Sequence, residues 1–248
     1  MFFSKYSASG NDFILMHTFR YKENSYSELA KKICHRQEGI GADGLIILKP
    51  HLEYDFEWEF YNADGSVAEM CGNGSRAAAM YARDLGLAGE RQKFLSKAGV
   101  IGVSIEGNWA ESALSKADIL QKEISEFGVK WWLLNTGVPH LVCENANLAF
   151  LNKEDLRFLR HKYNANINIA SLQDNRVLAR TFERGVEDET LACGTGMAAM
   201  FYYLFLLGKV SNPCLFNPAS GEDLYLREDK GTLYLKGEVR KICDFVKD

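Results

Sequence analysis

The most regular alternation of apolar and charged positions lies in residues 55–60, where Phe56, Trp58 and Phe60 are separated by glutamates. A period of two is typical of a half-buried strand. Residues 177–182 form a similar run that also closes on a phenylalanine. Apolar runs bounded by turn residues predict further strands over residues 44–48, 100–105, 131–134 and 233–235. The chain is therefore expected to be rich in short strands.

Fewer segments carry a helical pattern. Ser25 and Glu28 have the spacing of a capping box ahead of an amphipathic stretch. Asn152 is expected to cap a second helix over the apolar positions that follow it. A third helix, over residues 197–205, is apolar on every face and must therefore be buried all round. In a chain of short strands, the natural burial for such a helix is inside a curved sheet.

A short motif occurs twice, and each copy precedes a stretch containing small apolar residues: Cys71-Gly72-Asn73-Gly74 and Cys193-Gly194-Thr195-Gly196. Phe60 and Phe182 stand the same number of positions before the two cysteines, each at the end of a predicted strand. The likeness indicates an internal duplication and hence two domains of similar build. Each cysteine is expected to lie at the N-terminus of a helix.

Helix N-termini suit reactive thiols, because free backbone N–H groups and the positive end of the helix dipole stabilise a thiolate. A thiol of ordinary pKa is only about 3% ionised at pH 7, and a dipole contribution of ~1 kcal/mol raises that to roughly 15%. A place at a helix N-terminus therefore does not by itself keep most of a thiol ionised at pH 7. The two motifs also satisfy the loose dinucleotide-binding pattern G-x-G-x-x-A, but residues 94–97 do not supply the acidic strand end that this fold requires.

Composition narrows the classes of function. The chain has 248 residues, 47% of them hydrophobic, which is enough for two domains of roughly 120 residues each. The boundary is expected within residues 110–130, with an N-terminal half over 1–115, joined by 238–248, and a C-terminal half over 116–237. The net charge is −4, without blocks of like charge, which argues against nucleic acid or an anionic membrane as partner.

The sequence gives no indication of a secreted, membrane-spanning or zinc-binding protein. Its longest apolar run is too short to span a bilayer and no leader pattern opens the chain, so a cytoplasmic protein is expected. The cysteines lack C-x-x-C spacing, so no metal is expected. Four of them are interpreted as small buried residues: Cys34, Cys143, Cys214 and Cys243.

One longer stretch is more specific, because Asn62-Ala63-Asp64-Gly65-Ser66 precedes Cys71-Gly72-Asn73-Gly74-Ser75-Arg76. This pattern resembles the signature of diaminopimelate epimerases. Other segments resemble the same family and follow its order: Gly10-Asn11-Asp12-Phe13, Thr136-Gly137-Val138-Pro139-His140, Asn166-Ile167-Asn168-Ile169 and Glu183-Arg184-Gly185. The resemblance implies a mixed α/β (α+β) fold of two pseudo-symmetric domains. Each would be a curved, mostly antiparallel sheet around a central helix, with the active site in the cleft between the domains.

The implied reaction inverts one α-carbon of LL-2,6-diaminopimelate to give the meso isomer, a precursor of lysine and peptidoglycan, without pyridoxal phosphate, metal or another cofactor. Inversion needs a base on one face of the carbon and an acid on the other. One of Cys71 and Cys193 is therefore expected to be a thiolate while the other is a thiol. The resemblance adds His140 and Glu183 as groups that assist the thiols.

The resemblance also implies which residues contact the substrate. Backbone N–H groups of the two cysteine motifs would stabilise charge that develops on the proximal carboxylate. Arg184 offers a planar fork to the distal carboxylate. The full set is Asn11, Gly44, Asn62, Gly72, Asn73, Asn168, Glu183, Arg184, Gly194 and Thr195.

Two positions depart from the family pattern, Val138 where asparagine is common and Gly44 where glutamine is common. Both would lie near the distal amino-acid group.

Two other interpretations stay open. Paired cysteines also serve proline racemase-like enzymes, and two thiols could form the switch disulfide of a redox module. The family resemblance further implies a homodimer.

Overall fold

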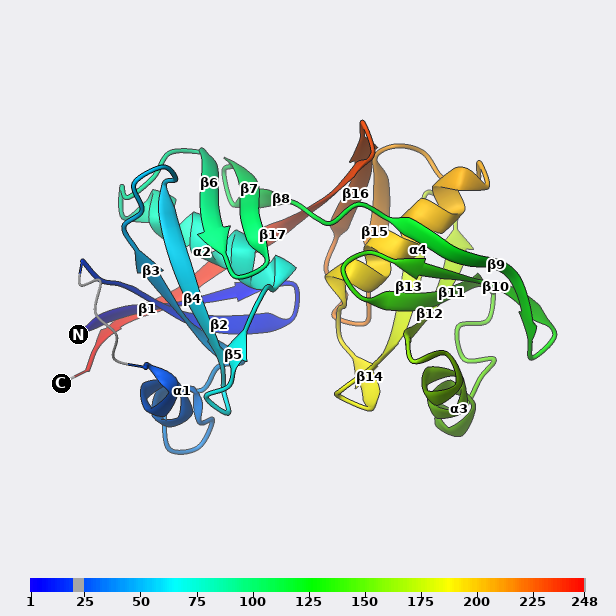
Figure 1. The fold of residues 1–248 in the computed structure, drawn as a ribbon, viewed down its shortest axis with the longest axis horizontal. Coiled ribbons are helices and arrows are strands. Elements are labelled where there is room, and N and C mark those ends of the chain that lie inside the picture. The colour runs from blue at the N-terminus through cyan, green and yellow to red at the C-terminus, as the bar shows by residue number, and fades with distance from the viewer. Residues whose placement is uncertain (20–24, 248) are drawn as a thin grey trace. The chain divides into compact units, whose positions relative to one another are not determined.

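The computed structural model describes residues 1–19 and 25–247. It is a mixed α/β structure dominated by strands, with four helices among the described residues (Figure 1). The chain divides into two compact units, Met1–Ser112 with Gly237–Asp248, and Ala113–Lys236. Within the described part of the chain, no helix has the length and apolar character needed to cross a membrane.

The strands of the first unit form a closed ring. Their bounds are β1 Phe2–Ala8, β2 Asn11–His17, β3 Gly44–Lys49, β4 Phe56–Asn62, β5 Val67–Ala68, β6 Arg91–Ser96, β7 Gly99–Glu106, β8 Trp109–Ala113 and β17 Thr232–Val246. Pairing runs in the order β17, β1, β2, β3, β4, β6, β7, β8, and β8 pairs with β17 again. The pairs β2–β3 and β4–β6 are parallel, so the ring is mostly antiparallel.

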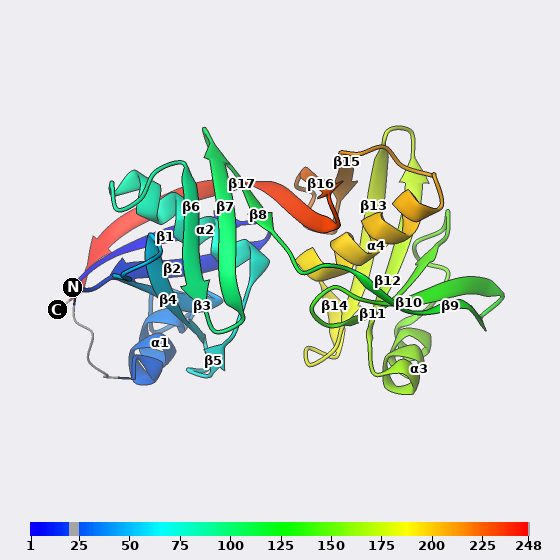
Figure 2. The ribbon, with the colours of Figure 1, turned by 45° about the horizontal axis from the view of Figure 1, so that its top comes forward.

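Helix α2 (Gly72–Asp84) lies within this ring, as Figures 1 and 2 show. All its residues from Asn73 to Ala82 are buried. Consecutive small residues, Ala77, Ala78 and Ala79, let the surrounding strands approach the helix from every side. A short helix α1 (Ser27–Cys34) packs on the outer face of the ring, against β3 and β4.

The second unit repeats the plan of the first. Its elements are β9 Asp118–Glu126, β10 Val129–Asn135, β11 Pro139–Glu144, α3 Lys153–Tyr163, β12 Asn166–Gln173, β13 Arg176–Glu183, β14 Asp188–Thr190, α4 Gly194–Leu206, β15 Cys214–Asn217 and β16 Leu224–Asp229. Strands β10 to β16 pair with the same orientations as β1 to β7, including parallel pairs β11–β12 and β13–β15. Helices α3 and α4 take the places of α1 and α2. The pseudo-symmetry predicted from the repeated motif is confirmed.

Most of α4 is buried, as its apolar sequence predicts. Residues from Gly196 to Phe201, with Tyr203 and Leu204, are inaccessible to solvent or nearly so. The last turn differs, because Leu206 is 44% exposed. Burial therefore holds for the middle of the helix, whereas Gly194, Thr195 and Tyr202 are partly exposed and the last turn reaches the surface.

The predicted strands are all present, most of them one or two residues longer than their apolar runs. The Asn152 cap is also confirmed, because its side chain accepts the backbone N–H groups of Glu154 and Asp155, and Asp155 returns a bond to the Asn152 N–H. The predicted Ser25–Glu28 capping box is wrong. Helix α1 begins at Ser27 behind Tyr26, which makes no side-chain cap bond, and Glu28 bonds to Lys31.

The prediction of four buried cysteines needs one correction. Cys34, Cys143 and Cys214 are buried, whereas Cys243 is exposed. Cys243 lies in the last part of β17, where most side chains face solvent. Cysteine is a small apolar residue and is usually buried, but its residue type does not show that the end of β17 is exposed.

Candidate active site

Cys71 and Cys193 occupy equivalent positions, the N-caps of the central helices α2 and α4. Both have extended backbone conformations, so the chain enters each helix from a strand-like segment through the cysteine. The predicted place of both thiols at a helix N-terminus is confirmed. This is where a thiolate gains most from the helix dipole and unpaired backbone N–H groups.

The Cys71 sulfur caps its own helix. Its Sγ accepts the backbone N–H of Gly74 at 3.4 Å. The carbonyl oxygen of Cys71 receives the Ser75 hydroxyl at 2.8 Å, which helps fix the entry to the helix. The side chain is partly exposed, so a thiolate here would be both stabilised and accessible.

Cys193 differs from Cys71 in what its sulfur faces. The side chain is 8% exposed and makes no cap bond to its helix. Its Sγ instead lies 3.5 Å from the hydroxyl oxygen of Thr195. Gly196 allows this arrangement, because a Cβ at that position would lie 2.3 Å from Oδ1 of Asn168 and 3.3 Å from the sulfur.

His140 lies in β11 beneath the second cysteine motif and is fully buried. Its Nδ1 is 3.0 Å from Nδ2 of Asn168, and its Nε2 is 3.0 Å from Oγ1 of Thr195. Burial lowers the pKa of His140 to about 3, and the positive charge of Arg184 acts in the same direction. The imidazole is therefore neutral at physiological pH.

We expect this buried histidine to make the protein acid-sensitive. The unfolded state takes up a proton near pH 6.5 and the native state only near pH 3, so the stabilisation is complete above pH 6.5 and is lost as the pH falls toward 3. Between pH 7 and 5 the free energy of unfolding should fall by about 2 kcal/mol more in the native protein than in His140→Gln. Urea titrations at both pH values measure this. An equal fall in the two proteins would contradict a neutral His140.

Glu183 and Arg184 follow each other at the end of β13. Burial raises the pKa of the Glu183 carboxyl, and the neighbouring Thr190 opposes the shift in part. The backbone N–H of Arg184 donates to Asn166 Oδ1 at 2.7 Å, and its Nη1 donates to the Asn164 carbonyl at 3.2 Å. Asn166 belongs to the motif Asn166-Ile167-Asn168-Ile169, from which only Asn168 was predicted to be a site residue. The structure shows that it holds the Arg184 backbone.

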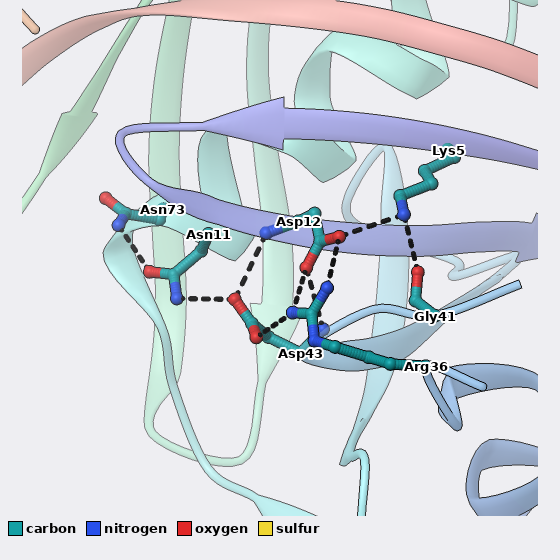
Figure 3. A network of polar contacts seen from close by, with 7 residues as sticks. All are labelled: Lys5, Asn11, Asp12, Arg36, Gly41, Asp43 and Asn73. Carbon is teal, nitrogen blue, oxygen red and sulfur yellow. Dashed lines mark hydrogen bonds and ion pairs between the residues drawn. The ribbon is translucent and has the colours of Figure 1, made fainter. Parts of the chain in front are cut away.

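In the first unit, Asn11 and Asn73 belong to one polar network, which Figure 3 shows. Asn73 donates to Asn11 Oδ1 at 2.7 Å, and Asn11 donates to Asp43 Oδ2 at 2.8 Å. Arg36 bridges the carboxylates of Asp43 and Asp12. These charges hold the Asn11 amide in one orientation beside the first cysteine motif.

Asn62 and Gly44 are cross-strand partners at the ends of β4 and β3. The Asn62 side chain donates to Ser66 Oγ at 3.0 Å and so belongs to the turn that follows β4. A Cβ at Gly44 would lie 2.4 Å from the Phe60 ring and 2.7 Å from the Tyr61 carbonyl oxygen. This backbone position therefore accepts only glycine unless β4 shifts.

Comparison with known proteins decides the family. Residues 3–118 match the family model described as diaminopimelate epimerase. A diaminopimelate epimerase of Nitratiruptor sp. is 56% identical, with 98% of this chain and 97% of that protein covered. The chain belongs to the diaminopimelate epimerase family. A member from Helicobacter pylori is 44% identical, with 98% of this chain and 94% of that protein covered.

Solved structures resemble the fold at much lower identity. A PhzF-family phenazine biosynthesis protein of Bacillus anthracis matches with a TM-score of 0.76 at 14% identity, covering 99% of this chain and 98% of that one. A probable proline racemase of Agrobacterium radiobacter K84 matches with a TM-score of 0.69 at 11% identity, covering 100% and 92%. The fold is thus shared with proline racemases, whereas close relatives place this chain among diaminopimelate epimerases. It is an isomerase whose substrate is a small molecule.

Proposed function

We propose that this epimerase interconverts LL- and meso-diaminopimelate by general acid–base catalysis at one α-carbon, with Cys71 and Cys193 acting on opposite faces. The observation that carries the proposal is the equivalence of the two thiols at the N-caps of α2 and α4. One sulfur removes the α-proton as a thiolate, and the other delivers its thiol proton to the opposite face. In the reverse direction the two sulfurs exchange roles.

Charge that develops on the substrate carboxylate needs stabilisation. Backbone N–H groups in the first turns of α2 and α4 have no acceptor within their own helix, and they belong to Gly72, Asn73, Gly194 and Thr195. We assign these groups to the proximal carboxylate, where preorganised donors stabilise the transition state more than the ground state. Asn11, Asn62 and Asn168 are assigned to the distal amino-acid group together with Arg184. Glu183 is assigned to substrate contact and, with His140, to assisting the thiols.

Cofactor independence, a homodimer, a cytoplasmic location and a place in lysine and peptidoglycan synthesis stay predictions. Two thiols that act as base and acid make an electron sink unnecessary in principle, because the helix N-termini stabilise the carboxylate instead. The alternative of a thiol redox module conflicts with the family assignment. A proline racemase-like enzyme shares the fold but is not among the close relatives described above.

The test is proton NMR of LL-diaminopimelate with the enzyme in deuterium oxide. The enzyme is dialysed against chelator and kept with reductant, without pyridoxal phosphate. We expect deuterium at the inverted α-carbon of the meso product while unreacted LL substrate still carries its α-proton, because the two faces use different thiols. A product that keeps the substrate's own proton would contradict the two-base scheme, as would a reaction that needs added metal or pyridoxal phosphate.

A further inference from the structure

A chain of side-chain contacts runs from the sheet to the second cysteine. Asn168 Nδ2 lies 3.0 Å from His140 Nδ1, and His140 Nε2 lies 3.0 Å from Thr195 Oγ1. The same Thr195 oxygen lies 3.5 Å from the Cys193 sulfur. His140 therefore reaches the thiol through the Thr195 hydroxyl. Asn168 and His140 are both fully buried, so water does not compete for these contacts.

The direction of each hydrogen bond in this chain follows from Asn168. Its Nδ2 donates to the carbonyl oxygen of Asn166 at 3.2 Å, and a carbonyl can only accept. Its Oδ1 receives the Thr181 hydroxyl at 3.1 Å. The Asn166 carbonyl fixes which end of the amide is nitrogen, and the Thr181 hydroxyl is free to donate to the other end. The second N–H of Asn168 then points at His140 Nδ1, which must accept.

A neutral imidazole that accepts at Nδ1 carries its proton on Nε2. His140 Nε2 therefore donates to the Thr195 oxygen. The Thr195 oxygen accepts from His140, so its own proton is available for the Cys193 sulfur 3.5 Å away. The links up to Thr195 thus have one permitted direction, and at the last link a thiolate sulfur can only accept, so the hydroxyl donates to it in that form.

We propose that Thr195 is a positioning residue for Cys193, whose hydroxyl donates to the sulfur and favours its thiolate form while His140 stays neutral and holds that hydroxyl in place. The inference rests on the proposed role of Cys193 as an acid–base group. When Cys193 acts as base, the substrate C–H bond breaks and an S–H bond forms. The hydroxyl proton stays on Thr195 and the imidazole proton stays on His140, so histidine neither gains nor loses a proton during turnover.

The first cysteine uses a different donor. The Cys71 sulfur accepts the Gly74 backbone N–H, and the residue that corresponds to Thr195 in the first motif is Asn73, which contacts Asn11. The backbone donor of Cys71 cannot be removed by side-chain substitution, whereas the donor of Cys193 can. Substitution of Thr195 should therefore affect one thiol and leave the other unchanged.

The experiment measures how fast each cysteine of the substrate-free protein reacts with iodoacetamide between pH 5 and 10, with peptide mapping. Thr195→Val should slow alkylation of Cys193 at pH 7 by about tenfold or more, because one hydrogen bond to a charged acceptor is lost. In Thr195→Val the midpoint of the pH profile of Cys193 alkylation should move to higher pH. In Thr195→Ser both the midpoint and the rate should be close to native. Cys71 should react as before. Thr232→Val, at the start of β17 in the same unit, is the matched control and should leave both profiles unchanged.

A Cys193 profile that is the same in Thr195→Val as in the native protein would overturn the proposal. So would a serine variant that behaves like the valine variant, because the hydroxyl would then not be the active group. These rates need no turnover. A protein that shows the expected profiles but does not epimerise diaminopimelate would therefore refute the proposed function and leave this inference standing.

Nitrogen-15 NMR of the histidine side chains gives an independent measurement. His140, assigned by its loss in His140→Gln, should carry its proton on Nε2 at pH 7 and remain neutral down to pH 5. The Gln variant places an amide N–H near the position of Nε2, so it should keep Cys193 alkylation closer to native rates than His140→Ala does. A proton on Nδ1, or an imidazolium signal above pH 5, would overturn the proposal.

Discussion

Cys71→Ala and Cys193→Ala are each expected to lower turnover of LL-diaminopimelate by ~10²–10⁴, the usual contribution of one acid–base group. Inversion needs both a base and an acid, so neither thiol can substitute for the other. The measurement is the initial rate of meso-diaminopimelate formation under reducing conditions. Cys243→Ala is the matched control, because this cysteine is exposed on β17, and its rate should be native.

Either alanine variant that keeps more than about a tenth of native turnover would contradict the two-base scheme. Circular dichroism and thermal unfolding check that each variant is folded. Only Cys71 makes a cap bond to its helix, and a lost cap costs about 1 kcal/mol and leaves the domain folded, whereas Cys193 makes no such bond. A large loss of activity with a native unfolding transition therefore reports on chemistry.

The fold was predicted from the period of two in apolar positions and from the repeated cysteine motif. The alternation in residues 55–60 predicted β4, and the repeated cysteine motif predicted two units of the same plan, because both signals are local in sequence. The capping box at Ser25 failed for a physical reason. The spacing of serine and glutamate is necessary for the box, but Glu28 bonds to Lys31 in α1 instead of turning back.

The contacts within the site were less predictable. His140 and Thr195 are 55 positions apart, and the packing of α4 on β11 brings them together. The expectation that His140 assists a thiol named the residue but not the hydroxyl between them. One signal was available in the sequence, because the second motif has a hydroxyl residue, Thr195, where the first has Asn73.

Asn168 illustrates the same limit. The family resemblance suggested a substrate contact, and that role stays an untested prediction. The structure shows it fully buried with bonds to Asn166, His140 and Thr181. Residues 166 and 168 point to the same side of β12, so a pattern of alternating asparagines does not reveal which one is nearer to Arg184. Only the bond from the Arg184 backbone to Asn166 distinguishes them.

Arg184→Lys is expected to lower kcat/KM for diaminopimelate by roughly ten- to a hundredfold, because lysine keeps the charge but loses the planar fork that binds a carboxylate at two points. One nitrogen of the Arg184 guanidinium already has a hydrogen-bond partner in the protein. Among the described residues its guanidinium donates from Nη1 to Asn164, which leaves the Nε–Nη2 edge for a ligand. If this edge binds the distal carboxylate, energy from the remote end of the substrate positions the reacting carbon. Turnover should therefore fall together with affinity.

Arg176→Lys is the matched control, because Arg176 lies at the opposite end of β13 and bonds to Asn217. Its kinetics should remain native. Lysine offered as substrate to the native enzyme has no distal carboxylate and should not be racemised. An Arg184→Lys variant with native kcat and KM, or native enzyme that racemises lysine readily, would show that Arg184 does not bind the distal end. Binding energy at that end would then have to come from neutral partners such as Asn11 and Asn62, which can donate N–H groups to a carboxylate but carry no positive charge to pair with it.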